Sequence, residues 1–213
     1  MTDYSRVERL ALCDLFDQLG PDQPTLCDGW TTHDLAVHLH VREADPLAGP
    51  GIMIPAFSET TERRMARAKA KYSFTEIVDL VRNGPPTFTI YSIPGLGHSL
   101  NTTEYFVHHE DVRRAQPDFA VRDLPADQQQ ALWKQVKLAA KTMTRKAPSG
   151  LVLRLPDGTE SVARRPGGQG SVTVTGEPAE LVLFTFGRQA VAKVELTGDP
   201  EIVERLKTTP FGP

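Results

Sequence analysis

Cysteine is scarce in this chain of 213 residues, which contains only Cys13 and Cys27. Two cysteines are too few to act as the covalent framework of a chain this long, and they lack the Cys-x-x-Cys spacing of common metal sites. We interpret both as buried thiols rather than metal ligands or nucleophiles. With 39% hydrophobic residues, the chain can instead build a core by packing.

Long hydrophobic runs and a strong excess of charge of one sign are also absent. No apolar run approaches membrane-spanning length, and the polar residues 1–6 lead into a helical pattern rather than a signal peptide. The formal net charge is -3, and the Lys and Arg residues are scattered along the chain. A basic surface for nucleic acid is therefore not expected. We expect a soluble, cytoplasmic protein that binds neither membrane nor nucleic acid.

Apolar residues recur at helical spacing through the first two thirds of the chain. Leu12, Leu15, Phe16 and Leu19 predict a helix over residues 3–19, which Gly20-Pro21 ends. A second helix is predicted after the capping-box spacing of Thr31 and Asp34. Ser73 with Glu76 likewise predicts the start of a short helix, which ends at Asn83-Gly84. Further helices are predicted over residues 58–71, around residues 103–115, and from Leu124 to Met143. Residues 45–57 are rich in Pro and Gly, and we interpret them as either a lid or a simple crossing.

The period of the hydrophobic pattern changes near Pro148-Ser149-Gly150. Residues 151–163 read as a β-hairpin, residues 171–175 as a third strand and residues 190–196 as a fourth, with helices over 178–187 and 199–206. We therefore place a domain boundary near residue 150. The fold class is α+β overall, with a helical domain over 1–147 and a small α+β domain, with a mostly antiparallel sheet, over 151–213.

Residues 103–115 combine a helical pattern with side chains that bind metals. His108 shares the core-facing stripe with Tyr105 and Val112, and Glu104 precedes it by one turn. A buried carboxylate and imidazole each need a partner, and a divalent metal would serve both. An alternative without metal fits the same residues, with Asn101 as helix N-cap and Glu104 closing a capping box.

His38 lies among the apolar residues of the predicted second helix, and taken alone it fits a core histidine hydrogen-bonded to a carbonyl better than a metal ligand. Taken together, His38, Glu104 and His108 supply three ligands suited to a first-row metal and leave one coordination position open, as in catalytic zinc sites. Zinc fits best, and nickel, iron, cobalt or manganese are alternatives. His109, Glu110, Asp111 and Arg113 could orient the ligands or form a solvated, salt-bridged helix face. For Glu110 and Arg114 we prefer the solvated, salt-bridged face.

Two stretches carry a family resemblance. Trp30 with Asp34-Leu35-x-x-His38-Leu39, and Glu104-x-x-x-His108 with Asp111-x-x-x-Ala115, resemble the paired signatures of the mycothiol-dependent maleylpyruvate isomerase group in the DinB-like metal-binding superfamily. The resemblance covers roughly residues 3–147. It implies a four-helix bundle that holds a divalent metal, usually zinc, through His38, Glu104 and His108. Residues 176–200 resemble the sterol-carrier-like domain that accompanies this bundle in many members.

The resemblance implies a metal- and thiol-dependent isomerase or S-transferase with mycothiol as co-substrate. Its partners would be a small thiol and a small electrophilic or anionic substrate, and Arg113 and Arg188 are candidates to bind a carboxylate. A metal-containing module that binds a ligand without turnover remains an alternative, because the sequence shows no obvious general base. The resemblance does not choose among substrates, and both a monomer and a homodimer fit the sequence.

Overall fold

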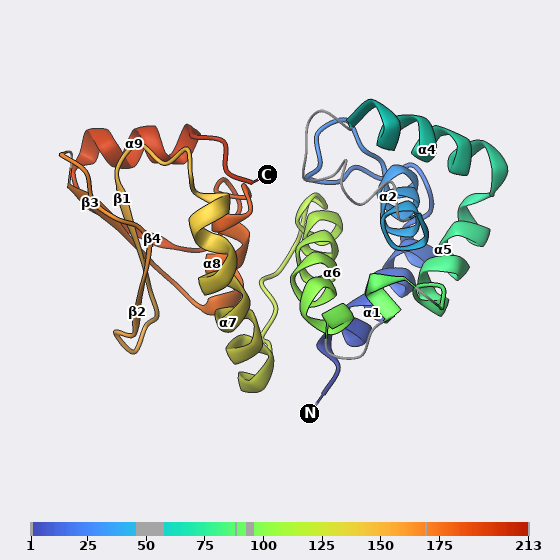
Figure 1. Cartoon of the computed structure of the whole chain (residues 1–213), viewed down its shortest axis with the longest axis horizontal. Coiled ribbons are helices and arrows are strands. Elements are labelled where there is room, and N and C mark those ends of the chain that lie inside the picture. The colour runs from blue at the N-terminus through green and yellow to red at the C-terminus, as the bar shows by residue number, and fades with distance from the viewer. Residues whose placement is uncertain (1, 46–57, 88, 93–95, 169, 213) are drawn as a thin grey trace. The chain divides into compact units, whose positions relative to one another are not determined.

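A computed structural model describes residues 2–45, 58–87, 89–92, 96–168 and 170–212 (Figure 1). The chain divides into two compact units, Met1–Val121 and Arg122–Pro213. This division precedes the helix α7, Ala126–Met143, whereas the sequence places a boundary near residue 150. On the apolar stripe of α7, Leu132 and Val136 are fully buried, and α7 packs on the helix α8 (Pro178–Thr185) of the second unit.

Helices make up the first unit. The described residues form α1 (Tyr4–Leu19), α2 (Thr32–Ala44), α4 (Ser58–Lys71), α5 (Phe74–Asn83), a 3-10 turn η2 (Ile90–Ser92) and α6 (Leu96–Arg114). The predicted capping boxes of Thr31 with Asp34 and of Ser73 with Glu76 are both present, so the local signals set the starts of α2 and α5.

The core of the first unit lies among α1, α2, α5 and α6. Helix α1 packs on α5 and α6, and α2 packs on α4 and α5. Fully buried side chains from all four core helices, including Phe16, Leu39, Ile77 and Tyr105, belong to one cluster. The four-helix bundle implied by the resemblance stays a prediction, because α4 is a further helix among the described residues.

The start of α6 tests the alternative in which Glu104 belongs to a helix cap. The helix begins at Leu96, so Asn101 lies inside it and is not its N-cap. The buried side chain of Asn101 instead bonds to Arg42 and Glu43 of α2. The alternative in which Glu104 closes a capping box at Asn101 is therefore wrong, and Glu104 points its carboxylate toward other side chains.

The second unit combines α7 with a four-stranded sheet of order β2-β1-β3-β4. Strands β1 (Gly150–Arg154) and β2 (Glu160–Arg164) form the predicted antiparallel hairpin. Strand β3 (Ser171–Thr175) crosses to the other side of β1 and pairs with it in parallel, and β4 (Glu195–Thr197) pairs antiparallel with β3. The sheet is therefore mixed, and the expectation of a mostly antiparallel sheet is not confirmed.

Helix α8 (Pro178–Thr185) connects β3 to β4 and is buried along its whole length. It lies beside α7, as Figure 1 shows within this unit, and α9 (Pro200–Thr208) follows β4. Asp199 caps α9, as its position before Pro200 predicts. Among the described residues, none of the helices is both long and apolar enough to cross a membrane.

Candidate metal centre

The three side chains singled out from the sequence meet in the first unit. His38 comes from the middle of α2, and Glu104 and His108 stand one turn apart on α6. The Nε2 atom of His38 lies 3.4 Å from Oε1 of Glu104, and Nε2 of His108 lies 3.3 Å from the same oxygen. All three donor atoms lie within 4.8 Å of one another. Helices far apart in sequence thus bring together two imidazoles and one carboxylate.

These distances suit a tetrahedral metal ion. Zinc binds histidine nitrogen and carboxylate oxygen at about 2.0–2.2 Å, and a tetrahedron with corners about 2.1 Å from its centre has edges of about 3.4 Å. The two donor-to-donor distances from Glu104 Oε1, 3.4 and 3.3 Å, match such edges. The donor set therefore fits a divalent ion, with a fourth corner left for another ligand.

The electrostatics of the cluster separate its two histidines. Burial lowers the pKa of His38, and the neighbouring His108 and Arg42 act in the same direction against Glu104. Burial also opposes charge on His108, but its hydrogen bonds to Asp111, Cys27 and Glu104 raise its pKa well above the usual value. Burial opposes charge on Glu104 too, yet Arg42 and both histidines hold its pKa well below the usual range. Without a metal, the contacts of His108 with Asp111 and Glu104 thus favour its protonated form, whereas burial favours the neutral form of His38.

Asp111 orients His108. Its Oδ2 atom lies 2.9 Å from Nδ1 of His108, one turn further along α6, and its side chain is fully buried. An imidazole whose Nδ1–H donates to a carboxylate presents Nε2 to the metal side with a fixed ring orientation. This pairing, foreseen as one option from the sequence, leaves Nε2 directed toward Glu104.

Cys27 contacts His108 and Asp111, which the sequence did not predict. Its Sγ lies 3.3 Å from Oδ2 of Asp111 and 3.9 Å from Nδ1 of His108. Cys27, His108 and Asp111 therefore form a second group with metal-ligand geometry. Asp111 already engages Nδ1 of His108 at hydrogen-bond distance. We therefore expect a metal to bind Nε2 of His108 rather than Nδ1. No spacing signal links Cys27 to α6, so only the folded chain reveals the contact.

The connection between α1 and α2 holds Cys27 against α6. The backbone N–H of Leu26 donates to the carbonyl oxygen of Asp111 at 3.0 Å. Further along the same connection, the Trp30 ring lies against the ring of His38, with centroids 5.0 Å apart. This segment therefore contacts a histidine of the candidate cluster on each of the two helices.

Arg42 is a second residue that the sequence did not identify. It lies one turn after His38 on α2, and its Nε atom is 3.1 Å from Glu104 Oε1. Its Nη1 donates to Asn101 Oδ1 at 2.7 Å, and Asn101 Nδ2 donates to Glu43 Oε1 at 2.7 Å. Arg9 of α1 completes the chain with two bonds of 2.6 Å to Glu43. A buried polar network thus leads from α1 to the candidate ligand.

The other charged residues of the α6 stretch have partners of their own. His109 pairs with Glu8 of α1 at 2.7 Å, and Glu110 pairs with Arg114 at 2.5 Å and with Arg113 at 3.0 Å. Glu110 and Arg114 form the expected salt bridge, but it is buried rather than solvated.

Arg188, a candidate from the sequence to bind a carboxylate, lies in the second unit. Residues 45–57 were predicted to form either a lid or a simple crossing. Apart from Asp45, this stretch lies outside the described residues.

The two thiols should differ in reactivity. Cys13 is fully buried, and this burial raises its pKa to about 12, whereas Cys27 is only partly buried. We expect an aromatic disulfide reagent to modify about one thiol per native chain and both thiols after unfolding, because the thiolate is the reactive form. A Cys27→Ser variant should lose the native reaction. Fast modification of both thiols in the native protein would contradict this assignment.

Comparison with solved structures agrees with the resemblance noted from the sequence. A crystal structure of the mycothiol-dependent maleylpyruvate isomerase matches with a TM-score of 0.62 and 17% identity, covering 93% of this chain and 92% of that chain. A structure of a histidine-to-alanine mutant of that isomerase matches with the same TM-score and coverage at 16% identity. No protein-family profile and no curated protein sequence matches the chain. This protein therefore has the fold of the mycothiol-dependent maleylpyruvate isomerase structures.

Proposed function

We propose that this protein binds one divalent metal ion, zinc in the first instance, through His38, Glu104 and His108. The observation that carries the proposal is the pair of donor distances, 3.4 and 3.3 Å from Glu104 Oε1, which suit a tetrahedral ion. Bound at three protein ligands, such an ion would act as a Lewis acid that ionises a thiol or water at the remaining position. The metal is the proposed cofactor; nickel, iron, cobalt or manganese would suit the same donors.

The proposed reaction class is transfer or isomerisation that depends on a small thiol. The solved structures with this fold are of an isomerase that depends on mycothiol, and a small thiol of that kind is the co-substrate proposed here. In this chain, Asp111 holds the ring of His108 and Arg42 holds the carboxylate of Glu104. The connection that carries Cys27 and Trp30 contacts Asp111 and the ring of His38.

Cobalt spectroscopy tests whether the site accepts a thiol. Protein purified without a metal-affinity tag should take up about one equivalent of Co²⁺, with the strong visible bands of a tetrahedral ion. N-acetylcysteine, added as a simple thiol, should then produce a new near-ultraviolet band from sulfur bonded to cobalt. A Glu104→Gln variant should show neither effect.

Three results would separate the alternatives. Cobalt uptake without a sulfur band would support metal binding but contradict the thiol-dependent reaction. A sulfur band without turnover of any thiol-dependent substrate would favour the ligand-binding module. Absence of metal uptake by the parent protein would remove the whole proposal.

A further inference from the structure

A cavity of about 320 Å³ lies between helices α2 and α4 of the first unit. The end of α2 contributes lining residues from His40 to its C-cap Asp45, and α4 contributes lining residues from Arg64 to Lys71, which Tyr72 follows. A volume of this size suits a small molecule. The candidate metal ligands are not among the residues that line the cavity, so this site is separate from the proposed metal centre.

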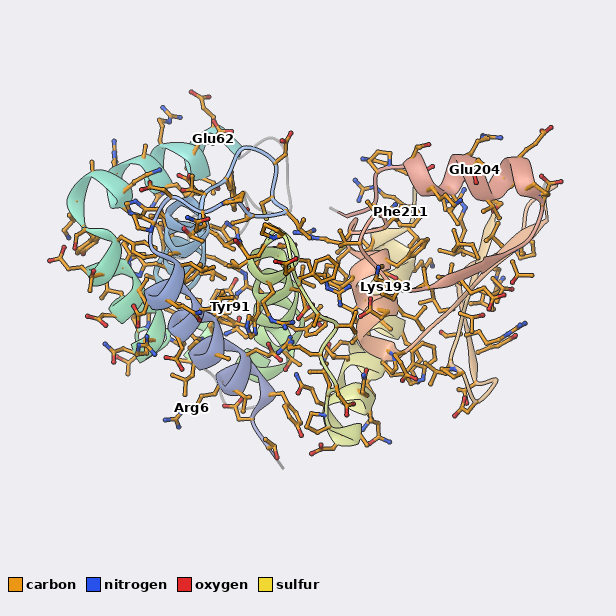
Figure 2. All side chains as sticks on the ribbon, turned by 180° about the vertical axis from the view of Figure 1, so that it is seen from behind. Arg6, Glu62, Tyr91, Lys193, Glu204 and Phe211 are labelled. Atoms are coloured by element: carbon orange, nitrogen blue, oxygen red, sulfur yellow. The ribbon has the colours of Figure 1, made fainter. Side chains whose placement is uncertain are left out.

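Positive side chains line the α4 side of the cavity. Arg64, Arg67 and Lys71 recur at spacings of three and four residues, so they share one face of the helix. The acidic residues Glu59 and Glu62 also belong to α4, where Figure 2 labels Glu62, but neither is among the lining residues. Three cations of α4 therefore line the cavity without an acidic neighbour from the same helix.

The carboxylate of Asp45 also lines the cavity, and it forms an ion pair with Arg64. Within the described part of the chain, Arg67 and Lys71 form no ion pair. Residues 46–57, which connect α2 to α4, contain neither Asp nor Glu. Three positive side chains and one carboxylate thus leave the cavity with two positive charges in excess.

The rest of the lining is aliphatic or aromatic. Val41 of α2 and Ala68 of α4 supply aliphatic surface. The ring of Tyr72 meets the ring of His40 edge to face, with centroids 5.9 Å apart, and the Nζ atom of Lys71 lies 4.6 Å from the centroid of the Tyr72 ring. Charged and apolar surfaces therefore lie side by side within one cavity.

We propose that this cavity binds a small phosphate monoester, with the phosphate group at Arg67 and Lys71 and the organic part against Val41 and Ala68. A phosphate monoester carries about -1.5 to -2 charges at pH 7, which matches the excess positive charge of the lining. Arginine binds phosphate oxygens through parallel N–H donors, and lysine binds them as a point charge. A carboxylate would match only one of the two cations.

Isothermal titration calorimetry at low salt, with three probes of similar size, tests the proposal. Phenyl phosphate should bind at one site per chain, benzoate about tenfold more weakly, and benzyl alcohol more weakly still. Added salt should weaken the binding of phenyl phosphate, because it screens exposed charges. A Glu104→Gln variant should bind phenyl phosphate as the parent does, because Glu104 belongs to the metal centre and does not line this cavity.

Substitutions on α4 test the two cations. Arg67→Gln and Lys71→Gln should each weaken the binding of phenyl phosphate about fivefold, and the double variant should weaken it more than about tenfold. Both side chains are exposed, and glutamine has a helix propensity close to those of arginine and lysine, so the fold should persist.

Arg63→Gln is the matched control. Arg63 lies on the same helix, but its side chain is 64% exposed and pairs with Glu59 rather than lining the cavity. This variant loses the same charge as Arg67→Gln and should keep its affinity for phenyl phosphate within about twofold of the parent.

Each contrary result has a definite meaning. Absence of phenyl phosphate binding, equally tight binding of benzyl alcohol, or equal losses in Arg63→Gln and the double variant would overturn the proposal. Tighter binding of benzoate than of phenyl phosphate would overturn the assignment to a phosphate monoester. Loss of binding in Glu104→Gln would place the phosphate at the metal centre instead of in this cavity. The cobalt experiment tests the metal site independently of all these results.

Discussion

Replacing His108 with alanine is expected to abolish metal binding while leaving the fold of the first unit in place. Loss of a residue that only supports a metal ligand already lowers affinity by about 10–100-fold, so loss of a ligand should exceed about 100-fold. His108 is also the group that links Glu104 to Asp111, with contacts of 3.3 and 2.9 Å. Its removal therefore deletes a donor and leaves the orientation of the remaining carboxylates unsupported.

Elemental analysis of untagged protein measures this effect directly. The parent should contain close to one equivalent of metal, and His108→Ala should contain almost none, even after zinc is added back and excess removed. His40→Ala is the matched control, because His40 lies on α2 near His38 but packs against Tyr72 outside the donor group. Full metal content in a folded His108→Ala variant would refute the ligand assignment.

Replacing Arg9 with methionine is expected to destabilise the first unit by about 3–5 kcal/mol. Arg9 makes two bonds of 2.6 Å to Glu43, whose side chain is 4% exposed, and a further bond of 2.9 Å to the carbonyl oxygen of Val81. Methionine fills much of the space but leaves the Glu43 carboxylate buried without its two bonds to Arg9, although Asn101 still donates to it. An uncompensated buried charge is the main cause of the expected loss.

Urea unfolding, followed by Trp30 fluorescence in a Trp133→Phe background, gives the free energy of unfolding of the first unit. The double variant Arg9→Met/Glu43→Leu removes both charges and should lie within about 2 kcal/mol of the parent. Arg82→Met breaks only surface pairs and should cost less than about 1 kcal/mol. If the double variant were less stable than Arg9→Met, loss of packing rather than the buried charge would explain the result.

Local signals in the sequence predicted local structure well. The spacings of Thr31 with Asp34 and of Ser73 with Glu76 predicted helix starts that the structure confirms. The start of α6 was missed, because Asn101 has the side chain of an N-cap but uses it to bond Arg42 and Glu43. The residue type alone does not show whether an asparagine side chain caps its own helix or bonds to side chains of another helix.

The candidate ligands could be selected from the sequence because each stands on a core-facing stripe with chemistry that a core rarely accepts. Arg42 and Cys27 carried no such signal. Arg42 looks like an ordinary charge near the end of a helix, and Cys27 lies in an irregular connection, so their contacts with Glu104 and Asp111 follow only from tertiary packing. The parallel pairing of β1 with β3 likewise depends on where the chain crosses, which alternating residues do not encode.

The sequence separation of the three candidate ligands has a consequence for assembly. Glu104 and His108 are neighbours on one helix, whereas His38 and Glu104 are 66 positions apart. A two-donor site therefore forms as soon as α6 forms, but the third donor arrives only when α2 docks. A bound ion would then act as a cross-link between distant segments and remove loop entropy from partly unfolded states. A bound ion would stabilise the first unit alone, since all three donors belong to that unit.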